Sequence, residues 1–171
     1  MKLGRSDFKA TMDVFSGAGI LEKLSLILST WFGTGLFPKG SGTVGTIAAI
    51  PFIALIHWLG GDVLVGICLV LFIPVSVWVS DISSRLLKKE DPSEVVIDEV
   101  AGMMLTMLFM PLTFNSYLAG FILFRIFDVL KPFPIGWADR RIKGGTGIVM
   151  DDLLAGLYAN LSLWIMFMVM E

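Results

Sequence analysis

Four carboxylates lie close together in residues 91–99, immediately before an apolar run that covers residues 100–112. They are Asp91, Glu94, Asp98 and Glu99. A carboxylate at the edge of hydrocarbon is costly unless it is paired, hydrated or bound to a metal ion, so this cluster predicts a functional site. Asp98 and Glu99 are adjacent, and neighbouring positions on a helix point about 100° apart. They can therefore hold one ion from two directions or divide two roles, whereas Asp91 is expected to support the site or to cap the helix.

A second charged cluster, Arg125, Asp128 and Lys131, has a spacing of three residues. This spacing predicts one stripe along a helix, with the carboxylate between two cations. The stripe is either part of a site or an ion-pair ladder that satisfies itself. A segment that served only as a membrane anchor would avoid three ionisable residues here.

A third cluster, Asp151 and Asp152, stands at the start of the last apolar run, residues 153–170. We expect this run to be a helix that begins at the two carboxylates, where the helix dipole stabilises negative charge. A helix cap explains one of these residues more easily than both.

Oxygen ligands without cysteine or an available histidine select a hard cation, so the clusters predict a Mg²⁺ or Mn²⁺ site. The expected metal ligands or general base are Asp98, Glu99, Asp128, Asp151 and Asp152. The basic residues expected to bind phosphate charge are Arg125, Lys131 and Arg140. Together these groups indicate metal-assisted phosphoryl chemistry, in which an activated water or a direct carboxylate nucleophile attacks. The spacing does not separate these two nucleophiles.

Residues 32–46 contain five glycines and one proline, a composition that we expect to exclude a regular helix. Free N–H groups in such a loop can cradle an anion, and Lys39, Gly42 and Thr43 are the expected contacts. The spacing is not that of a Walker A loop. A re-entrant or capping loop without a ligand is the alternative.

The elements that must position these residues are apolar helices. The chain of 171 residues is 56% hydrophobic with a mean hydropathy of +0.82, above the usual ~45–50% apolar content of soluble domains. The apolar segments are residues 44–59, 63–80, 100–112, 117–130 and 153–170. The second and fifth approach the ~20 residues needed to span a bilayer. The expected fold is all-α, a polytopic membrane helical bundle of about four to five membrane segments in a single domain, residues 1–171.

The N-terminal segment, residues 1–31, carries apolar residues at helical spacing from residue 20 to residue 31. This pattern predicts an amphipathic helix, lying either in the membrane interface or against the rest of the protein. We expect no cleavable signal peptide, because residues 1–16 are polar and mixed in charge. Cys68 lies in an apolar run and is the only cysteine, which excludes an intramolecular disulfide.

Charge placement predicts the topology. If the chain starts in the cytoplasm, the five segments place residues 60–62, residues 113–116 and the C-terminus outside, and none of the 13 Lys and Arg residues falls there. The acidic clusters and the glycine-rich loop then share the cytoplasmic face. The only histidine, His57, falls near the outer end of the first segment, which disfavours a phosphohistidine mechanism.

Three other classes of protein are alternatives to a metal-dependent enzyme that hydrolyses a phosphate ester. A small membrane cation transporter predicts carboxylates distributed through the membrane depth, whereas these gather at one face and only Asp62 stands opposite. A lipid-binding scaffold leaves the metal-type cluster unexplained. A lipid phosphotransferase would use a similar ion and phosphate grip, but it normally carries a motif of spaced Asp-Gly pairs that is absent from this sequence.

The sequence also resembles the bacterial phosphatidylglycerophosphatase A family of membrane lipid phosphatases from about residue 33 to residue 160. The matching residues are Gly42-Thr43-Val44-Gly45, then Asp91, Val96-Ile97-Asp98-Glu99 and Gly102, then Phe124-Arg125-Ile126-Phe127-Asp128, Lys131-Pro132-Phe133-Pro134-Ile135, Trp137 and Asp139-Arg140, and finally Gly144-Gly145, Gly147-Ile148, Asp151-Asp152 and Ala155-Gly156. One departure is that the family's first loop commonly reads Pro-Gly-Thr-x-Gly, where this chain has Ser41 in place of the proline.

This resemblance implies Mg²⁺-dependent hydrolysis of phosphatidylglycerophosphate to phosphatidylglycerol and inorganic phosphate. It implies an integral protein of the bacterial inner membrane, multi-pass, with its active site on the cytoplasmic face and a lipid rather than a nucleic acid as its partner. Another lipid phosphomonoester remains open as the preferred substrate.

Overall fold

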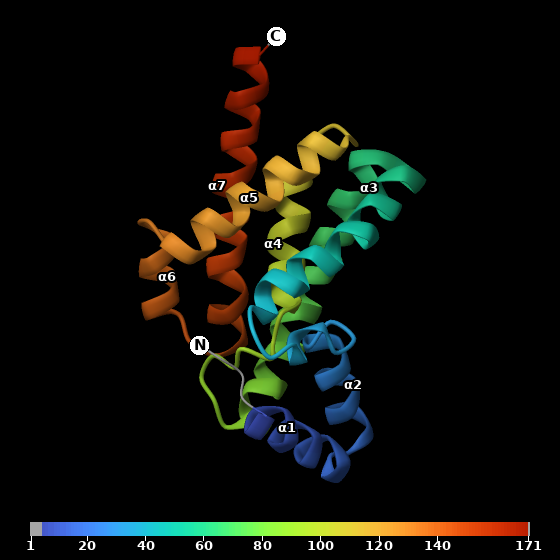
Figure 1. The fold of residues 1–171 in the computed structure, drawn as a ribbon, viewed down its shortest axis with the longest axis vertical. Coiled ribbons are helices and arrows are strands. Elements are labelled where there is room, and N and C mark those ends of the chain that lie inside the picture. Colours follow the sequence, from blue (N-terminus) through green and yellow to red (C-terminus); the bar gives the residue numbers. More distant parts are fainter. Residues whose placement is uncertain (1–4, 171) are drawn as a thin grey trace.

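The computed structural model describes residues 5–170, and within that range the chain forms seven α-helices, one short 3-10 helix and no strand. The helices are α1 (Arg5–Gly17), α2 (Ile20–Ser29), η1 (Thr34–Leu36), α3 (Ser41–Leu87), α4 (Ile97–Met107), α5 (Phe114–Leu130), α6 (Ile135–Arg141) and α7 (Gly144–Met170). Figure 1 shows α4 near the centre of the bundle, with α3, α5 and α7 around it. The all-α fold expected from the sequence is confirmed.

Helix α3 is two helices joined by a sharp break. A straight helix of 47 residues would be about 70 Å long, more than twice the thickness of a hydrocarbon core. The break lies at Gly60 and Gly61, whose backbone angles are not helical; Gly61 has φ 60° and ψ −160°, which a side chain would disfavour. The chain reverses at this point in Figure 1, as expected for residues 60–62.

Helix α4 is short and central. Its 11 residues rise only about 16 Å, too little to cross a bilayer. Its side chains Val100, Met103, Met104 and Met107 are fully buried. The carbonyl groups at its C-terminal end do not face hydrocarbon, because Asn160 of α7 donates hydrogen bonds to the carbonyl oxygens of Thr106 (2.9 Å) and Leu108 (2.8 Å). The expected segment at residues 100–112 is therefore a buried half-length helix.

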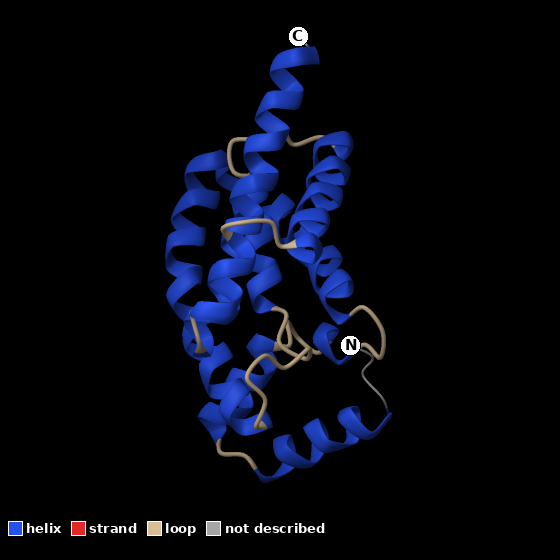
Figure 2. Cartoon of the chain, turned by 90° about the vertical axis from the view of Figure 1, so that its left-hand side faces the viewer, coloured by secondary structure: helices blue, strands red, loops and turns tan. Residues whose placement is uncertain are grey.

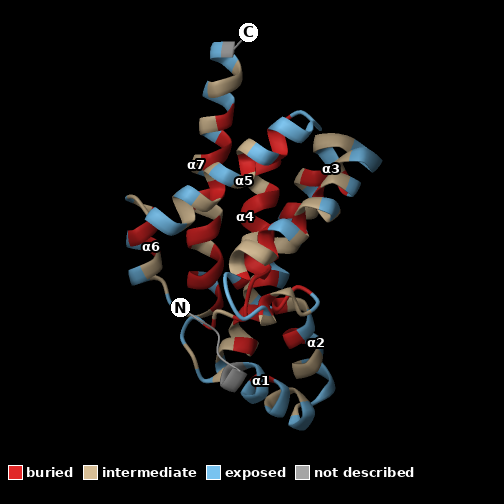
Figure 3. Cartoon of the chain, viewed as in Figure 1, coloured by how far each residue is buried: buried red, intermediate tan, exposed pale blue. Residues whose placement is uncertain are grey.

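Two helices in the described part of the chain are long and apolar enough to cross a membrane, Ser41–Leu87 and Gly144–Val169. Only 28% of the most apolar window in each is buried within the protein. The outer faces of α3, α5 and α7 expose large apolar side chains, and Figure 3 shows pale exposed stretches along these helices around a buried interior. The number of four to five membrane segments stays a prediction.

The N-terminal helices lie at the end of the molecule opposite the C-terminus. Figure 2 shows α1 running across this end, and α2 packs against α3. The helix expected at residues 20–31 is present as α2, which ends at Ser29. Its first turn is stabilised because the Glu22 carboxylate accepts a hydrogen bond from the N–H of Gly19 (2.7 Å).

Two glycine-rich stretches are more helical than the sequence predicts. Helix α3 begins at Ser41, so Gly42 and Gly45 lie in its first turns rather than in a loop that extends to residue 46. Helix α7 begins at Gly144, so Asp151 is seven residues inside the helix and does not begin it. Gly45 packs against Val96, which precedes α4, and Gly145 packs against the backbone of Val77 in α3. This close packing offsets the low helix propensity of glycine.

Candidate active site

A polar cavity of about 620 Å³ opens at the end of the bundle where α3, α4 and α7 begin. Its walls come from segments far apart in the sequence: the start of α3, the stretch between α3 and α4, the end of α5, α6, and the start of α7. The three predicted charged clusters all contribute to it, through Asp98 and Glu99, through Arg125, Asp128 and Lys131, and through Asp151 and Asp152. Convergent polar groups in a cavity of this size are typical of ligand sites.

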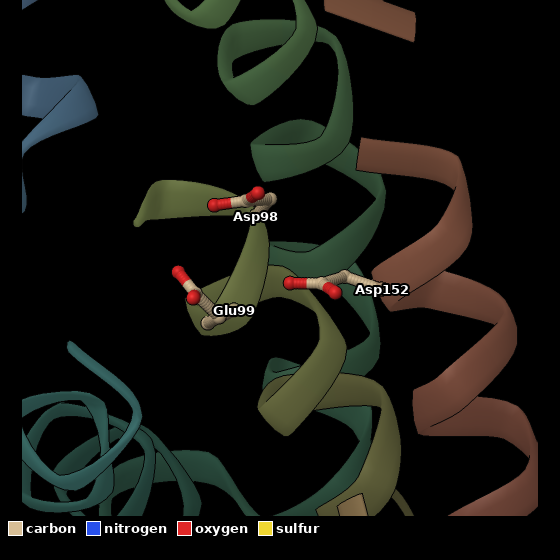
Figure 4. Close-up of side chains that lie close together, drawn as sticks. All are labelled: Asp98, Glu99 and Asp152. Carbon is tan, nitrogen blue, oxygen red and sulfur yellow. The ribbon is translucent and has the colours of Figure 1, made fainter. Parts of the chain in front are cut away.

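Asp98, Glu99 and Asp152 form the tightest group of carboxylates in the described chain. One carboxylate oxygen from each lies within 4.8 Å of those of the other two. Figure 4 shows Asp98 and Glu99 at the start of α4, with Asp152 projecting from α7 towards them. Each residue has one buried carboxylate oxygen without a hydrogen-bond partner in residues 5–170: Oδ1 of Asp98, Oε2 of Glu99 and Oδ2 of Asp152.

Three carboxylates packed this closely repel one another unless a cation or protons lie between them. An all-oxygen donor set with unsatisfied buried oxygens fits a hard divalent cation such as Mg²⁺. The residues present therefore fit the ion expected from the sequence. All five expected ligands line the cavity, but the group within 4.8 Å contains only Asp98, Glu99 and Asp152, while Asp128 and Asp151 pair with Arg125 and Lys131.

Close helix packing brings these carboxylates together. A Cβ atom on Gly156 of α7 would collide with the carbonyl oxygen of Gly102 of α4, and a Cβ atom on Gly102 would lie 2.7 Å from the carbonyl oxygen of Asp152. Only glycine allows the backbones of α4 and α7 to approach so closely. The contact lies one turn from Glu99, so it fixes the start of α4 against Asp152.

The stretch before α4 is anchored on its other side. The N–H of Val96 donates to the carbonyl oxygen of Ser29 (2.8 Å), and the hydroxyl of Ser41 donates to the carbonyl oxygen of Ser93 (2.6 Å). The buried carboxylate of Glu94 accepts a hydrogen bond from the ammonium of Lys89 (2.6 Å). These contacts tie the start of α4 to α2 and α3.

Arg125 links α5 to the carboxylate group. Its Nη1 lies 2.7 Å from Oδ2 of Asp128 and 3.8 Å from Oε1 of Glu99. A Cβ atom on Gly42 would collide with Oε1 of Glu99, so the first turn of α3 approaches this pair with no room for a side chain. Glu99 and Arg125 thus meet the N-terminus of α3 at the same point.

Lys131 does not extend the stripe of Arg125 and Asp128, which corrects the expected carboxylate between two cations. It ends α5 in a left-handed conformation with φ 43°, and its ammonium lies 2.6 Å from Oδ1 of Asp139 and 2.6 Å from Oδ2 of Asp151. Burial alone would lower the pKa of Lys131, but the hydrogen bonds to Asp139 and Asp151 outweigh burial and raise the pKa above its usual value. The side chain is a permanent cation across normal pH.

The remaining predicted residues separate into two groups. Gly42 and Arg140 line the cavity, and so does Asp91. Lys39 and Thr43 are not among the residues that line it, and Lys39 is exposed. Asp139, the second partner of Lys131, is not among the site residues expected from the sequence. Two prolines separate these residues, and no helical periodicity relates them.

His57 lies away from the cavity, near the break in α3. Its Nε2 is 3.6 Å from Oδ1 of Asp62, which also accepts a hydrogen bond from the N–H of Phe109 (2.8 Å). His57 is not among the cavity-lining residues. This position agrees with the expectation that His57 is remote from the carboxylates.

Comparison with known proteins identifies relatives over most of the chain. The family model described as Phosphatidylglycerophosphatase A matches residues 27–167. A phosphatidylglycerophosphatase A of Escherichia coli (strain K12) is 37% identical over 137 residues, which cover 77% of this chain and 76% of the relative. A phosphatidylglycerophosphatase A of Haemophilus influenzae is 34% identical over 146 residues, covering 81% and 89%.

A third relative has a different name. A putative phosphatidylinositol-3-phosphatase of Bacteroides thetaiotaomicron is 37% identical over 143 residues, which cover 80% of this chain and 89% of the relative. No solved structure matches the chain.

Proposed function

Because this chain belongs to the phosphatidylglycerophosphatase A family of phosphoric monoester hydrolases, we propose that it hydrolyses phosphatidylglycerophosphate. The products are phosphatidylglycerol and inorganic phosphate, so the reaction is a step of phosphatidylglycerol biosynthesis. The observation that carries this proposal is the group of Asp98, Glu99 and Asp152, with unsatisfied buried oxygens in a cavity beside Arg125.

We propose that Asp98, Glu99 and Asp152 hold one Mg²⁺ ion. When bound, the ion neutralises charge on phosphate oxygens and activates the attacking group. Asp128 and Asp151 act differently in this scheme. Asp128 orients Arg125, and Asp151 orients Lys131, because each carboxylate already binds its basic partner at 2.7 Å or less.

The other residues of the cavity bind and orient the phosphate. The N–H groups of Arg125 donate hydrogen bonds to the phosphate oxygens. These bonds stabilise the negative charge that develops in the transition state. Gly40, Ser41 and Gly42 line the cavity at the start of α3, where the first N–H groups of a helix are free to bind an anion. Lys131 supplies positive charge beside Asp151, and Arg140 lies on the wall that α6 forms.

We further propose that the protein is a multi-pass protein of the bacterial inner membrane with the cavity at the cytoplasmic face. The two halves of α3 together with α5 and α7 form the membrane-embedded bundle, and α4 lies inside it. The support is the exposed apolar surface of these helices and the absence of Lys and Arg from residues 60–62 and residues 113–116. The scheme places His57 and Asp62 at the opposite membrane surface.

A second candidate function is hydrolysis of another lipid phosphomonoester, such as a phosphoinositide. The similarity to the putative phosphatidylinositol-3-phosphatase favours keeping this candidate. A cation transporter is less well supported, since the unsatisfied carboxylates gather at one end of the bundle and form no path through it.

Phosphate release from purified protein in detergent tests the proposal. We expect release from phosphatidylglycerophosphate to exceed that from phosphatidylinositol 3-phosphate and from phosphatidate, to stop when EDTA removes Mg²⁺, and to return when Mg²⁺ is added back. Preference for the phosphoinositide would favour the second candidate, and release that is unaffected by EDTA would contradict the metal site.

A further inference from the structure

We propose that Arg140 binds the second phosphate of the substrate, the phosphodiester that joins the two glycerol groups, and thereby selects lipids that carry a diester next to the phosphomonoester. This inference rests on the proposed function and deepens it. It assigns the two phosphates of one headgroup to different ends of the cavity.

Ion pairing leaves Arg140 as the available cation. Four basic side chains line the cavity: Arg125, Lys131, Arg140 and Lys143. Arg125 and Lys131 are bound to the carboxylates of the site, and Lys143 lies 3.2 Å from Glu90. Within residues 5–170, Arg140 forms no ion pair with a carboxylate. Its charge is therefore free to meet an anion that enters the cavity.

Arg140 is in the last turn of α6, and its guanidinium reaches back to the first turn of α6, at the corner between α5 and α6. A Cβ atom on Gly136 would lie 3.4 Å from Nη1 of Arg140 and 2.6 Å from the carbonyl oxygen of Lys131. From this corner the Lys131 side chain reaches Asp151, which precedes Asp152 in α7. The pair of Lys131 and Asp151 thus connects the Arg140 end of the cavity to the proposed metal end.

The same corner carries an apolar edge suited to lipid chains. Leu130, Phe133 and Trp137 are 73%, 81% and 49% exposed; the first two lie on either side of Lys131 in the sequence, and Trp137 precedes Arg140 by three residues. Tryptophan beside basic residues is typical of the membrane interface. In the substrate the diester is the phosphate nearest to the acyl chains. When the acyl chains lie along this edge and the phosphomonoester lies beside Arg125, the phosphodiester therefore lies beside Arg140.

The size of the cavity agrees with this assignment. A single phosphate group fills a small part of about 620 Å³, and the rest accommodates the glycerol and the second phosphate. One bidentate pair of an arginine with a phosphate contributes enough to change binding by about tenfold or more.

The two products allow the two phosphate positions to be tested separately. Phosphatidylglycerol retains the diester alone, and inorganic phosphate stands for the monoester. Both are added as inhibitors of phosphatidylglycerophosphate hydrolysis in non-ionic detergent micelles without other phospholipid, so that bulk lipid supplies no diester. The variants are Arg140→Gln, Arg140→Lys and the control Arg141→Gln, whose exposed side chain does not line the cavity.

We expect Arg140→Gln to raise KM about tenfold with kcat within threefold, to weaken inhibition by phosphatidylglycerol about tenfold, and to leave inhibition by inorganic phosphate within twofold. Arg140→Lys should recover part of the loss, and Arg141→Gln should match the parent protein. Equal weakening of both inhibitors, unchanged inhibition by phosphatidylglycerol, or complete loss of turnover in Arg140→Gln overturns the inference. A parent protein that releases no phosphate from phosphatidylglycerophosphate overturns the proposed function instead.

Discussion

At the scale of single residues, the site is defined by which charges are already paired. Arg125 holds Asp128, and Lys131 holds Asp139 and one oxygen of Asp151. Asp98, Glu99 and Asp152 form the closest group of carboxylates, and each of them has an unsatisfied buried oxygen, as Asp151 also does. Clustered buried carboxylates are costly unless a cation or protons offset their charge, so this group of three fits the cation that we propose.

The role of Asp152 is directly testable. Asp152→Asn removes one of three charges from the proposed metal ligands but keeps the shape of the side chain. We expect turnover to fall by on the order of 100-fold or more, with a much weaker Mg²⁺ requirement in the residual activity. Asp13→Asn on the exposed surface of α1 is the matched control and should retain full turnover. Near-normal turnover in Asp152→Asn would contradict the proposed ligand set.

Lys131 joins two carboxylates, and its removal should affect stability as well as activity. In Lys131→Met, Asp139 and Asp151 lose a shared partner at 2.6 Å and repel one another. We expect the variant to lose about 2–3 kcal/mol of stability, a value reduced from that of a fully buried pair because the side chains are partly exposed. Thermal unfolding in detergent measures this loss. The double variant Lys131→Met with Asp139→Asn should recover part of it, and no recovery would argue against the pairing.

At the scale of helices, close packing of α4 on α7 sets the distance between Asp98, Glu99 and Asp152. Gly156→Ala would place a methyl group against the carbonyl oxygen of Gly102, and neither backbone can yield without separating the helices. We expect about 1–3 kcal/mol of destabilisation together with weaker Mg²⁺ binding.

Gly66 provides the matched control for this substitution. It also lies inside a helix, but a Cβ atom there would meet only Cδ1 of Leu108 at 3.7 Å, an ordinary contact. Gly66→Ala should therefore leave both stability and Mg²⁺ binding intact. Equal effects of the two substitutions would show that the contact between α4 and α7 does not position the site.

Asn160 allows α4 to end inside the bundle. Asn160→Leu removes the donor to the carbonyl oxygens of Thr106 and Leu108 and leaves them buried. We expect a loss of about 1–3 kcal/mol in thermal or denaturant unfolding, because an unsatisfied buried carbonyl carries a desolvation penalty. Ser162→Ala, two residues away, removes only a bond to its own helix and should change little. Equal stability of Asn160→Leu and the parent protein would refute this role.

The sequence was sufficient to predict the helices and the convergence of the charged clusters on one cavity. Apolar segments, turn residues and charge placement carry that information locally. It was not sufficient to predict that α7 starts at Gly144 or that α4 stops at Met107, since both limits depend on contacts with other helices. For the same reason the pairing of Lys131 with Asp139 and Asp151 could not be predicted from spacing, because Lys131 has a left-handed backbone and does not continue the helix of α5.

At the scale of the whole molecule, the protein has a charged end and an apolar body. The cavity lies where α3, α4 and α7 begin, while the break in α3 and the turn before α5 lie at the other end of the bundle. Exposed apolar side chains cover the helices between these two ends. This arrangement suits an enzyme that meets a lipid headgroup at one membrane surface.

Cysteine labelling tests this orientation. In a Cys68→Ala background, Arg141→Cys reports on the cavity end, and Asn115→Cys reports on the turn before α5; both positions are exposed. We expect an impermeant maleimide added to intact cells to label Asn115→Cys alone, and disrupted cells to label both. Labelling of Arg141→Cys in intact cells would contradict a cytoplasmic site.

Calorimetric titration of the detergent-purified protein with Mg²⁺ tests the metal site itself. We predict one ion per chain in the parent protein and no measurable binding in Asp98→Asn, Glu99→Gln or Asp152→Asn, with each variant still folded. Asp139→Asn, which alters a carboxylate outside this group, should still bind one ion. Unchanged binding in all three ligand variants would contradict the account.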